Sequence, residues 1–240
     1  MNLLSFARAK THQLDEELEA YRRLQARGFQ PGYIIDVGAH VGRWTQGARD
    51  IFGTVPTLMV EPQEADQPRL RALCDRLPQT SLANHVLAAE AGRNLTFYQL
   101  MPDDGAASSS GSSLKPERSD VPRREIRFIS ETLDRIADRR DAIFLKIDAQ
   151  GSELDVLLGG EATLARCALV QLEVSVMHYN EGAPTMLEVL AFMDARGFAP
   201  IDVSGRTRIQ GHLVQLDMIF APANSALRRD FFRFSSGGAG

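Results

Sequence analysis

Two acidic residues and two glycines in the first third of the chain have the types and spacing of a nucleoside-binding site. Asp36, Gly38 and Gly42 belong to the segment Asp-Val-Gly-Ala-His-Val-Gly, which begins within the short apolar run 33–37. Glycine lets a backbone turn sharply towards a ligand, and a helix that begins after such a turn presents unpaired N–H groups. Glu61 ends the next apolar run. A carboxylate at that place can accept hydrogen bonds from both hydroxyls of a ribose.

A nicotinamide dinucleotide is one alternative ligand for this turn. Its binding sequence, Gly-x-Gly-x-x-Gly, would require glycine at positions 40 and 43 when it is counted from Gly38. The chain has His40 and Arg43 there, and such side chains would obstruct a pyrophosphate. The observed Asp-x-Gly-x-x-x-Gly instead resembles the first motif of class I methyltransferases. Asp36 would then hold the cationic amino group of S-adenosylmethionine, directly or through water. The other interpretation is that these residues form only a tight turn and a surface acid and bind no ligand.

Four ionisable residues in the second half of the chain are candidates for acid–base chemistry. Asp148 and Glu173 end or nearly end the apolar runs 143–148 and 169–174, which we expect to be adjacent strands, and Lys146 lies on the same side of its strand as Asp148. Either acid could be a general base, and Asp148 could also contact the cofactor. These three residues could equally form a satisfied polar network. His178 follows in a loop, and imidazole as a side-chain type suits a general base, although a lone histidine is more often a surface or packing residue.

Metal binding has weaker support in the sequence. Paired carboxylates could hold Mg²⁺ through oxygen ligands, but no third ligand can be named, so magnesium is possible and not expected. The two cysteines, Cys74 and Cys167, belong to no CxxC or histidine-rich set, which argues against structural zinc. Two cysteines cannot form a disulfide framework, and this fits a reducing compartment such as the cytoplasm.

Composition excludes several other classes of protein. The formal net charge is −4, so the chain lacks the basic footprint of a nucleic-acid-binding protein. The sequence contains no run of about 18 apolar residues, so it predicts no membrane-spanning helix. Hydrophobic residues make up 44% and charged residues 24%, values that are ordinary for soluble globular proteins. The oligomeric state is not readable from these numbers.

The elements that must position these residues alternate between strand and helix. Strands are expected at 33–37, 58–61, near 82–88, 95–100, 143–148, 169–174, 198–203 and 213–220, and helices at 11–27, 43–52, 64–77, 153–158 and 184–196, with Pro184 in the first turn of the last. This alternation predicts right-handed βαβ units. The fold class is therefore α/β and Rossmann-like, with a mostly parallel seven-stranded sheet, an antiparallel edge hairpin and helices on both faces.

Three parts of the chain differ in expected organisation. Residues 1–28 are an N-terminal helical extension, 29–222 the main domain, and 223–240 a C-terminal tail whose end, 235–240, is expected to be disordered. Within the domain, residues 102–120 are rich in Pro, Asp, Gly and Ser and lose all periodicity. They are expected to form a long loop that either closes over substrate or is a disordered insertion.

Longer blocks of sequence resemble the FkbM family of methyltransferases. Residues 144–153, Phe-Leu-Lys-Ile-Asp-Ala-Gln-Gly-Ser-Glu, are similar to the family's lKiDvqGaE signature, and 156–160 to its vLlGg. Further similar blocks follow the family's order at 112–114, 132–134, 171–174, Tyr179-Asn180, 197–198 and 217–220. The resemblance covers about 34–220. His40 stands where Asn is usual, which puts in doubt the hydrogen bond made from that turn, and Ala149 stands where a β-branched residue is common.

This resemblance implies a class I fold, S-adenosylmethionine as cofactor and O-methylation of a hydroxyl. The implied acceptor is a small molecule or glycan, either a sugar or a polyketide-type metabolite. The residues by themselves indicate only a transferase fold that binds S-adenosylmethionine. Two alternatives of other classes stay open: a catalytically silent nucleoside-binding or scaffold protein on the same fold, and a nicotinamide-dependent oxidoreductase.

Overall fold

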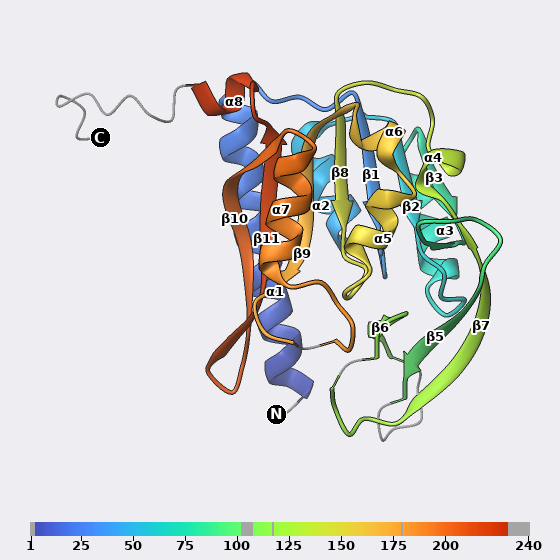
Figure 1. The fold of residues 1–240 in the computed structure, drawn as a ribbon. Helices are drawn as coiled ribbons and strands as arrows, with labels where there is room; N and C mark the ends of the chain where they lie inside the picture. The colour runs from blue at the N-terminus through green and yellow to red at the C-terminus, as the bar shows by residue number, and fades with distance from the viewer. Residues whose placement is uncertain (1–2, 102–107, 117, 179, 230–240) are drawn as a thin grey trace.

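A seven-stranded sheet forms the centre of the computed structural model, which describes residues 3–101, 108–116, 118–178 and 180–229 (Figure 1). The strand order is β10-β11-β9-β8-β1-β2-β3. The five strands from β9 to β3 pair in parallel, whereas β11 pairs antiparallel with both β9 and β10. This confirms the mostly parallel sheet with an antiparallel edge hairpin. The bounds are β1 Tyr33–Val37, β2 Thr57–Val60, β3 Thr80–Ala83, β8 Ile143–Ile147, β9 Cys167–Ser175, β10 Phe198–Ile209 and β11 His212–Pro222.

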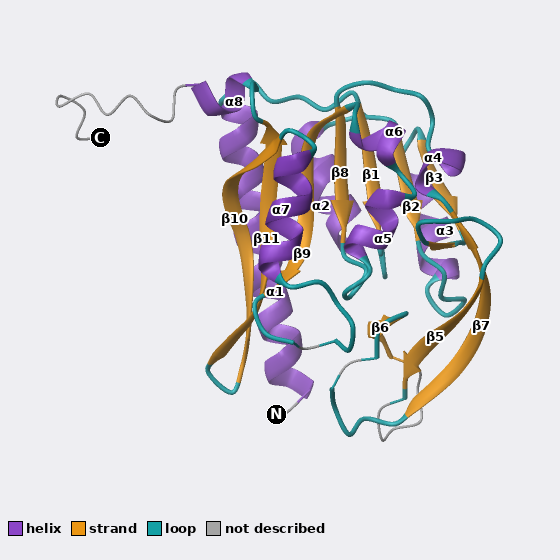
Figure 2. Ribbon diagram, viewed as in Figure 1, coloured by secondary structure: helices purple, strands orange, loops and turns teal. Residues whose placement is uncertain are grey.

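Helices cover both faces of this sheet, as Figure 2 shows. Alternate residues of β1 point to opposite faces, so that Ile34 packs with the first two helices and Ile35 with those of the second half of the chain. One face carries α1 Leu3–Ala26, α2 Arg43–Phe52 and α3 Gln67–Arg76. The other carries α4 Leu133–Ile136, α5 Glu153–Leu158, α6 Glu161–Leu164 and α7 Met186–Ala195, and α8 Ala226–Arg229 follows β11.

A second, four-stranded sheet extends past the carboxyl ends of the central strands. Its order is β4-β7-β5-β6, with bounds β4 Val86–Leu87, β5 Asn94–Leu100, β6 Ser108–Ser113 and β7 Arg123–Glu131. The ribbon of β5 and β7 lies beyond β1 and β8 in Figure 1, with β6 between. The expected loop at 102–120 is therefore wrong for 108–113, because these residues pair with β5. Residues 102–107 and 117 lie outside the described residues.

Several expected boundaries also move. The single strand near 82–88 is two strands, β3 and β4, which belong to different sheets. Helix α1 begins at Leu3, well before the expected start. Helix α7 begins after Thr185, which forms a capping box with Glu188, so Pro184 precedes the helix and does not occupy its first turn. Tyr179 and the expected disordered end of the tail lie outside the described residues.

The N-terminal helix is packed into the core. Ala20, Tyr21 and Leu24 are buried against the sheet together with residues of α2. Gly47 of α2 makes this close approach possible, because a Cβ atom there would lie 2.7 Å from Leu18 Cδ2. Among the residues that the structure describes, no helix is both long and apolar enough to cross a membrane.

Candidate active site

The turn between β1 and α2 is built on left-handed backbone. Gly38, His40 and Gly42 have φ angles of 76°, 51° and 79°. A Cβ atom on Gly38 would lie 2.0 Å from the carbonyl oxygen of Asp148, and one on Gly42 would lie 2.5 Å from Leu73 Cδ2 of α3. Both distances are far below van der Waals contact. The two glycines therefore first serve the packing of the protein itself: Gly38 against the end of β8, and Gly42 against α3.

Glu61 joins the end of β2 to this turn. Its carboxylate accepts hydrogen bonds from the backbone N–H of His40, at 2.8 Å, and of Gln63, at 3.0 Å. The side chain is buried, and burial raises the pKa of Glu61 to about 7, although the hydrogen bonds from Gln63 and His40 act in the opposite direction. Glu61 is therefore held in place and titrates near neutral pH.

A cavity connects the carboxyl ends of the central strands with the second sheet. It contains about 730 Å³ of space between protein atoms, including solvent at its mouth. One part is polar and is lined by the turn and by the segment after β8, with Gly38, His40, Glu61, Asp148 and Gln150. Another part is apolar, with Val86, Leu87, Phe97 and Val156, and residues 111–114 of β6 and its end also line the cavity.

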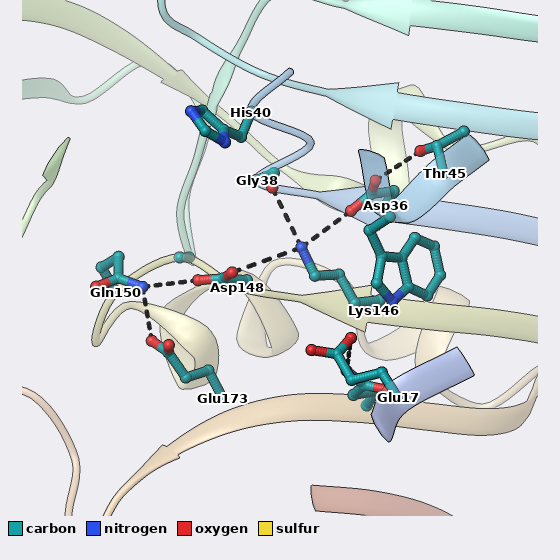
Figure 3. A network of polar contacts seen from close by, with 12 residues as sticks. Glu17, Asp36, Gly38, His40, Thr45, Lys146, Asp148, Gln150 and Glu173 are labelled. Carbon is teal, nitrogen blue, oxygen red and sulfur yellow. Dashed lines mark hydrogen bonds and ion pairs between the residues drawn. The ribbon is translucent and has the colours of Figure 1, made fainter. Parts of the chain in front are cut away.

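Lys146 is the centre of a buried polar network beneath the turn (Figure 3). Its amino group donates to the carbonyl oxygen of Gly38 at 3.2 Å and forms ion pairs with Asp36 Oδ1 at 3.1 Å and Asp148 Oδ2 at 3.7 Å. Burial lowers the pKa of Lys146, but the carboxylates of Asp36 and Asp148 outweigh this effect and raise it. Asp36 is fully buried and also accepts a hydrogen bond from Thr45 Oγ1 at 2.6 Å. The lysine is thus a fixed cation that ties β1, β8 and the turn together.

A glutamine amide bridges Asp148, which follows β8, and Glu173, which lies near the end of the neighbouring strand β9. Gln150 Nε2 donates to Asp148 Oδ1 and to Glu173 Oε2, each at 2.8 Å (Figure 3). Gln215 Nε2 donates to the same oxygen of Glu173 at 2.9 Å. The backbone of Gln150 is left-handed, with φ of 51°, and Glu153 holds this bend by accepting from the backbone N–H of residues 149 and 151. Burial raises the pKa of Glu153 to about 7.

Residues 36–200 match the family model described as "Methyltransferase FkbM domain". The chain belongs to the FkbM family of methyltransferases. It is therefore an S-adenosylmethionine-dependent methyltransferase, and this excludes the nicotinamide-dependent oxidoreductase. A comparison with curated proteins found no significant match.

Solved structures of methyltransferases are similar to this chain at low sequence identity. A protein of Pyrococcus horikoshii provisionally described as an RNA methyltransferase matches with a TM-score of 0.50 and 12% identity, over 89% of this chain and 83% of that one. Magnesium protoporphyrin IX methyltransferase of Synechocystis PCC 6803, with bound S-adenosylmethionine, gives 0.49 and 10%, over 92% and 84%. The 1,6-didemethyltoxoflavin-N1-methyltransferase of Burkholderia thailandensis gives 0.46 and 14%, over 87% and 79%.

The structure of this FkbM methyltransferase brings most of the candidate residues together. Asp36, Gly38, Lys146 and Asp148 form one network, while His40 and Glu61 are joined on the other side of the turn. Gly42 faces α3, and Glu173 is linked to Asp148 through Gln150.

His178 lies apart from that network. It is exposed and does not line the cavity. The hydrogen bonds from Thr185 are the largest cause that lowers the pKa of Glu188, and an electrostatic interaction with His178 lowers it further. The catalytic and cofactor-binding roles of all these residues stay predictions.

Sequence reasoning missed three kinds of residue at this site. Gln150 stood in the family signature, but its bridging position depends on the left-handed backbone. Ser152 lines the cavity, and its buried hydroxyl has no hydrogen-bond partner among the described residues. Glu17 and Tyr21 come from α1, before the segment that matches the family, where the sequence pattern indicated only a helix.

Proposed function

We propose that this methyltransferase transfers the methyl group of S-adenosylmethionine to a hydroxyl of a sugar, glycan or polyketide-type metabolite. The observation that carries the proposed site is a cavity that is lined both by Glu61, which is anchored to the Gly38 turn, and by Asp148. The hydroxyl chemistry and the acceptor class rest on the resemblance of the family blocks. The acceptor is expected to reach the site from the side of Asp148 and Glu173.

The lining of the cavity supports one orientation of the cofactor. Glu61 is placed to accept hydrogen bonds from the ribose hydroxyls. The apolar surface of Val86, Leu87 and Phe97 suits the flat base. We propose that the buried Ser152 hydroxyl, which has no hydrogen-bond partner among the described residues, binds a polar atom of that base. The amino acid portion would then lie along the Gly38 turn. Asp36 is already paired with Lys146 and Thr45, so we propose that it favours the cationic amino group through water.

The protein's part in the reaction is to orient the acceptor and take its proton. S-adenosylmethionine supplies the electrophilic methyl group when it is bound. We propose Asp148 as the proton acceptor because its side chain is about one-third exposed, at 36%, and lies at the cavity. Glu173 is its alternative, reached through Gln150. A positioned base contributes about 10²- to 10⁴-fold in such reactions.

Activity assays would test this assignment. The protein is incubated with S-adenosylmethionine labelled in its methyl group and with panels of monosaccharides, glycans and polyketide-derived alcohols, and the site of methylation is identified by NMR. Asp148→Asn and Glu173→Gln are expected to lower kcat while cofactor affinity, measured in parallel by calorimetry, is largely kept. His178→Ala is compared because His178 is the third candidate base. Methylation only at nitrogen or carbon would contradict the proposal, and unchanged turnover in both acid variants would remove them from the base role.

A further inference from the structure

We propose that Tyr21, on the N-terminal helix α1, is a positioning residue for the cofactor site, acting through Trp44 and Lys146 on the Gly38 turn. This inference rests on the proposed placement of the cofactor. Helix α1 precedes the segment matched by the family model, residues 36–200, so the role belongs to an element outside the family domain.

The Tyr21 hydroxyl connects three parts of the chain. Tyr21 is fully buried, and its oxygen accepts a hydrogen bond from Trp44 Nε1 at 2.7 Å. The hydroxyl lies within donating distance of Gln171 Oε1, with Glu17 Oε2 further away at 3.4 Å. Gln171 Nε2 in turn donates to Glu17 Oε2 at 3.2 Å. A single phenol oxygen therefore joins α1, the first turn of α2 and strand β9 within the core.

Trp44 connects the Tyr21 hydroxyl to the Gly38 turn. It is the second residue of α2, two positions after Gly42, and its ring packs edge-on to Tyr21 with centroids 5.9 Å apart. The amino group of Lys146 lies 5.8 Å from the centroid of the same ring. Lys146 then holds the carbonyl oxygen of Gly38. Tyr21 thus acts on both ends of the turn: through Trp44 on its helical end, and through Lys146 on its strand end.

Glu17 adds an electrostatic reason for this arrangement. Burial, followed by the nearby charge of Asp217, raises the pKa of Glu17 well above its ordinary value. A carboxyl that favours its neutral form competes weakly for the charge of Lys146. The lysine is left to Asp36 and Asp148, the two acids with which it forms ion pairs. Helix α1 therefore places one buried carboxyl near the lysine without taking over its ion pairs.

The surface contacts of α1 explain its position less well than the buried Tyr21 hydroxyl does. Its ion pairs with β10, Arg23–Asp202 and Glu16–Arg206, involve side chains that are one-third to two-thirds exposed. Exposed ion pairs contribute little to stability. The buried hydroxyl, with partners on two other elements, is the contact that selects one position of the helix against the turn.

The single tryptophan of the chain gives a direct readout. S-adenosylhomocysteine is titrated into wild type, Tyr21→Phe and the control Tyr33→Phe, with Trp44 fluorescence and calorimetry in parallel. Tyr33 is also buried, but it is the first residue of β1 and so lies at the end of the strand away from the turn. We expect ligand-dependent emission in wild type and Tyr33→Phe. Tyr21→Phe should lose that change and bind about 3- to 10-fold more weakly, the effect of one hydrogen bond.

A double-mutant cycle separates positioning from general destabilisation. Trp44→Phe removes the N–H donor and keeps an aromatic ring, so calorimetry should show the same weakening as Tyr21→Phe. The double variant should bind no more weakly than either single variant, because both changes break one pathway. Additive losses, equal losses in Tyr21→Phe and Tyr33→Phe, or wild-type affinity in a folded Tyr21→Phe would overturn the inference.

Failure of the proposed site gives a different result. If Glu61→Gln binds S-adenosylhomocysteine at pH 8 as wild type does, the ligand lies elsewhere, and the proposed cofactor placement falls together with the inference. If a folded Glu61→Gln loses binding while Tyr21→Phe keeps it, the placement stands and the inference alone is refuted.

Discussion

Replacing Glu61 by glutamine should move stability and cofactor binding in opposite directions. Burial raises the pKa of Glu61 to about 7 in the folded protein, against an ordinary value of 4.5. A carboxyl whose pKa is raised on folding stabilises the fold fully below the unfolded pKa, and that contribution is lost as the pH rises through the folded pKa. Glutamine does not ionise and avoids this loss.

The size of the effect follows from the difference between the two pKa values. It corresponds to about 3 kcal/mol of unfolding free energy when the pH is well above 7. Wild type and Glu61→Gln should therefore differ little near pH 5, and the variant should gain up to about 3 kcal/mol relative to wild type between pH 5 and pH 9. Urea unfolding at several pH values measures this difference. Glu153, whose pKa is also about 7, titrates in both proteins and cancels from the comparison.

The second half of the prediction concerns how cofactor affinity depends on pH. In the proposed site the ribose hydroxyls would donate to an ionised Glu61, so the affinity of wild type for S-adenosylhomocysteine should rise between pH 6 and pH 8. Glu61→Gln should bind more weakly above pH 7 and lose most of this pH dependence; Glu153→Gln is the matched control and should retain it. Unfolding free energies that stay parallel with pH, or a binding profile that is the same in wild type and Glu61→Gln, would refute the reasoning.

Other substitutions test the packing and the polar network. Gly38→Ala places a Cβ atom 2.0 Å from a backbone carbonyl oxygen and should lower the unfolding free energy by about 4 kcal/mol or more. Gly28 also has a left-handed φ but has open space around it, so Gly28→Ala should lower the unfolding free energy by only about 1 kcal/mol. Thermal unfolding measures both, and equal losses would contradict the clash. Ser152→Ala should weaken S-adenosylhomocysteine binding several-fold in calorimetry with little change in melting temperature, and an unchanged Kd would exclude a contact to the base. Lys146→Met leaves Asp36 buried without its cation and should lower the unfolding free energy, measured with urea, by about 3–5 kcal/mol. The double variant Lys146→Met with Asp36→Asn should recover part of this unfolding free energy. No recovery would count against the ion pair.

The acidic and glycine residues of the site were predictable because their positions depend on local sequence. Apolar runs mark the buried parallel strands, so the carboxyl ends that carry Asp36, Glu61 and Asp148 can be found from the runs themselves. Parallel strands bring these ends to one edge of the sheet. Lys146 follows from alternation, because it lies two residues before Asp148 on the same side of β8.

The residues that were missed depend on contacts between distant elements. Tyr21 has the spacing of an apolar stripe on α1, and only the packed structure shows that its hydroxyl meets Trp44 and Gln171. Strand β6 consists of five serines and one glycine and therefore has no hydrophobic alternation to detect. Its pairing is fixed by the neighbouring strand β5, which sequence periodicity cannot reveal.

The attachment of the second sheet limits how the cavity can change shape. Its wall at β6 belongs to a hydrogen-bonded ladder with β5 and β7, and this ladder joins β4 through only two paired positions, Val86 with Ser130 and Leu87 with Glu131. A motion that widens the cavity on this side must therefore carry the ladder with it, so substitutions near Leu87 are expected to alter association and dissociation rates together.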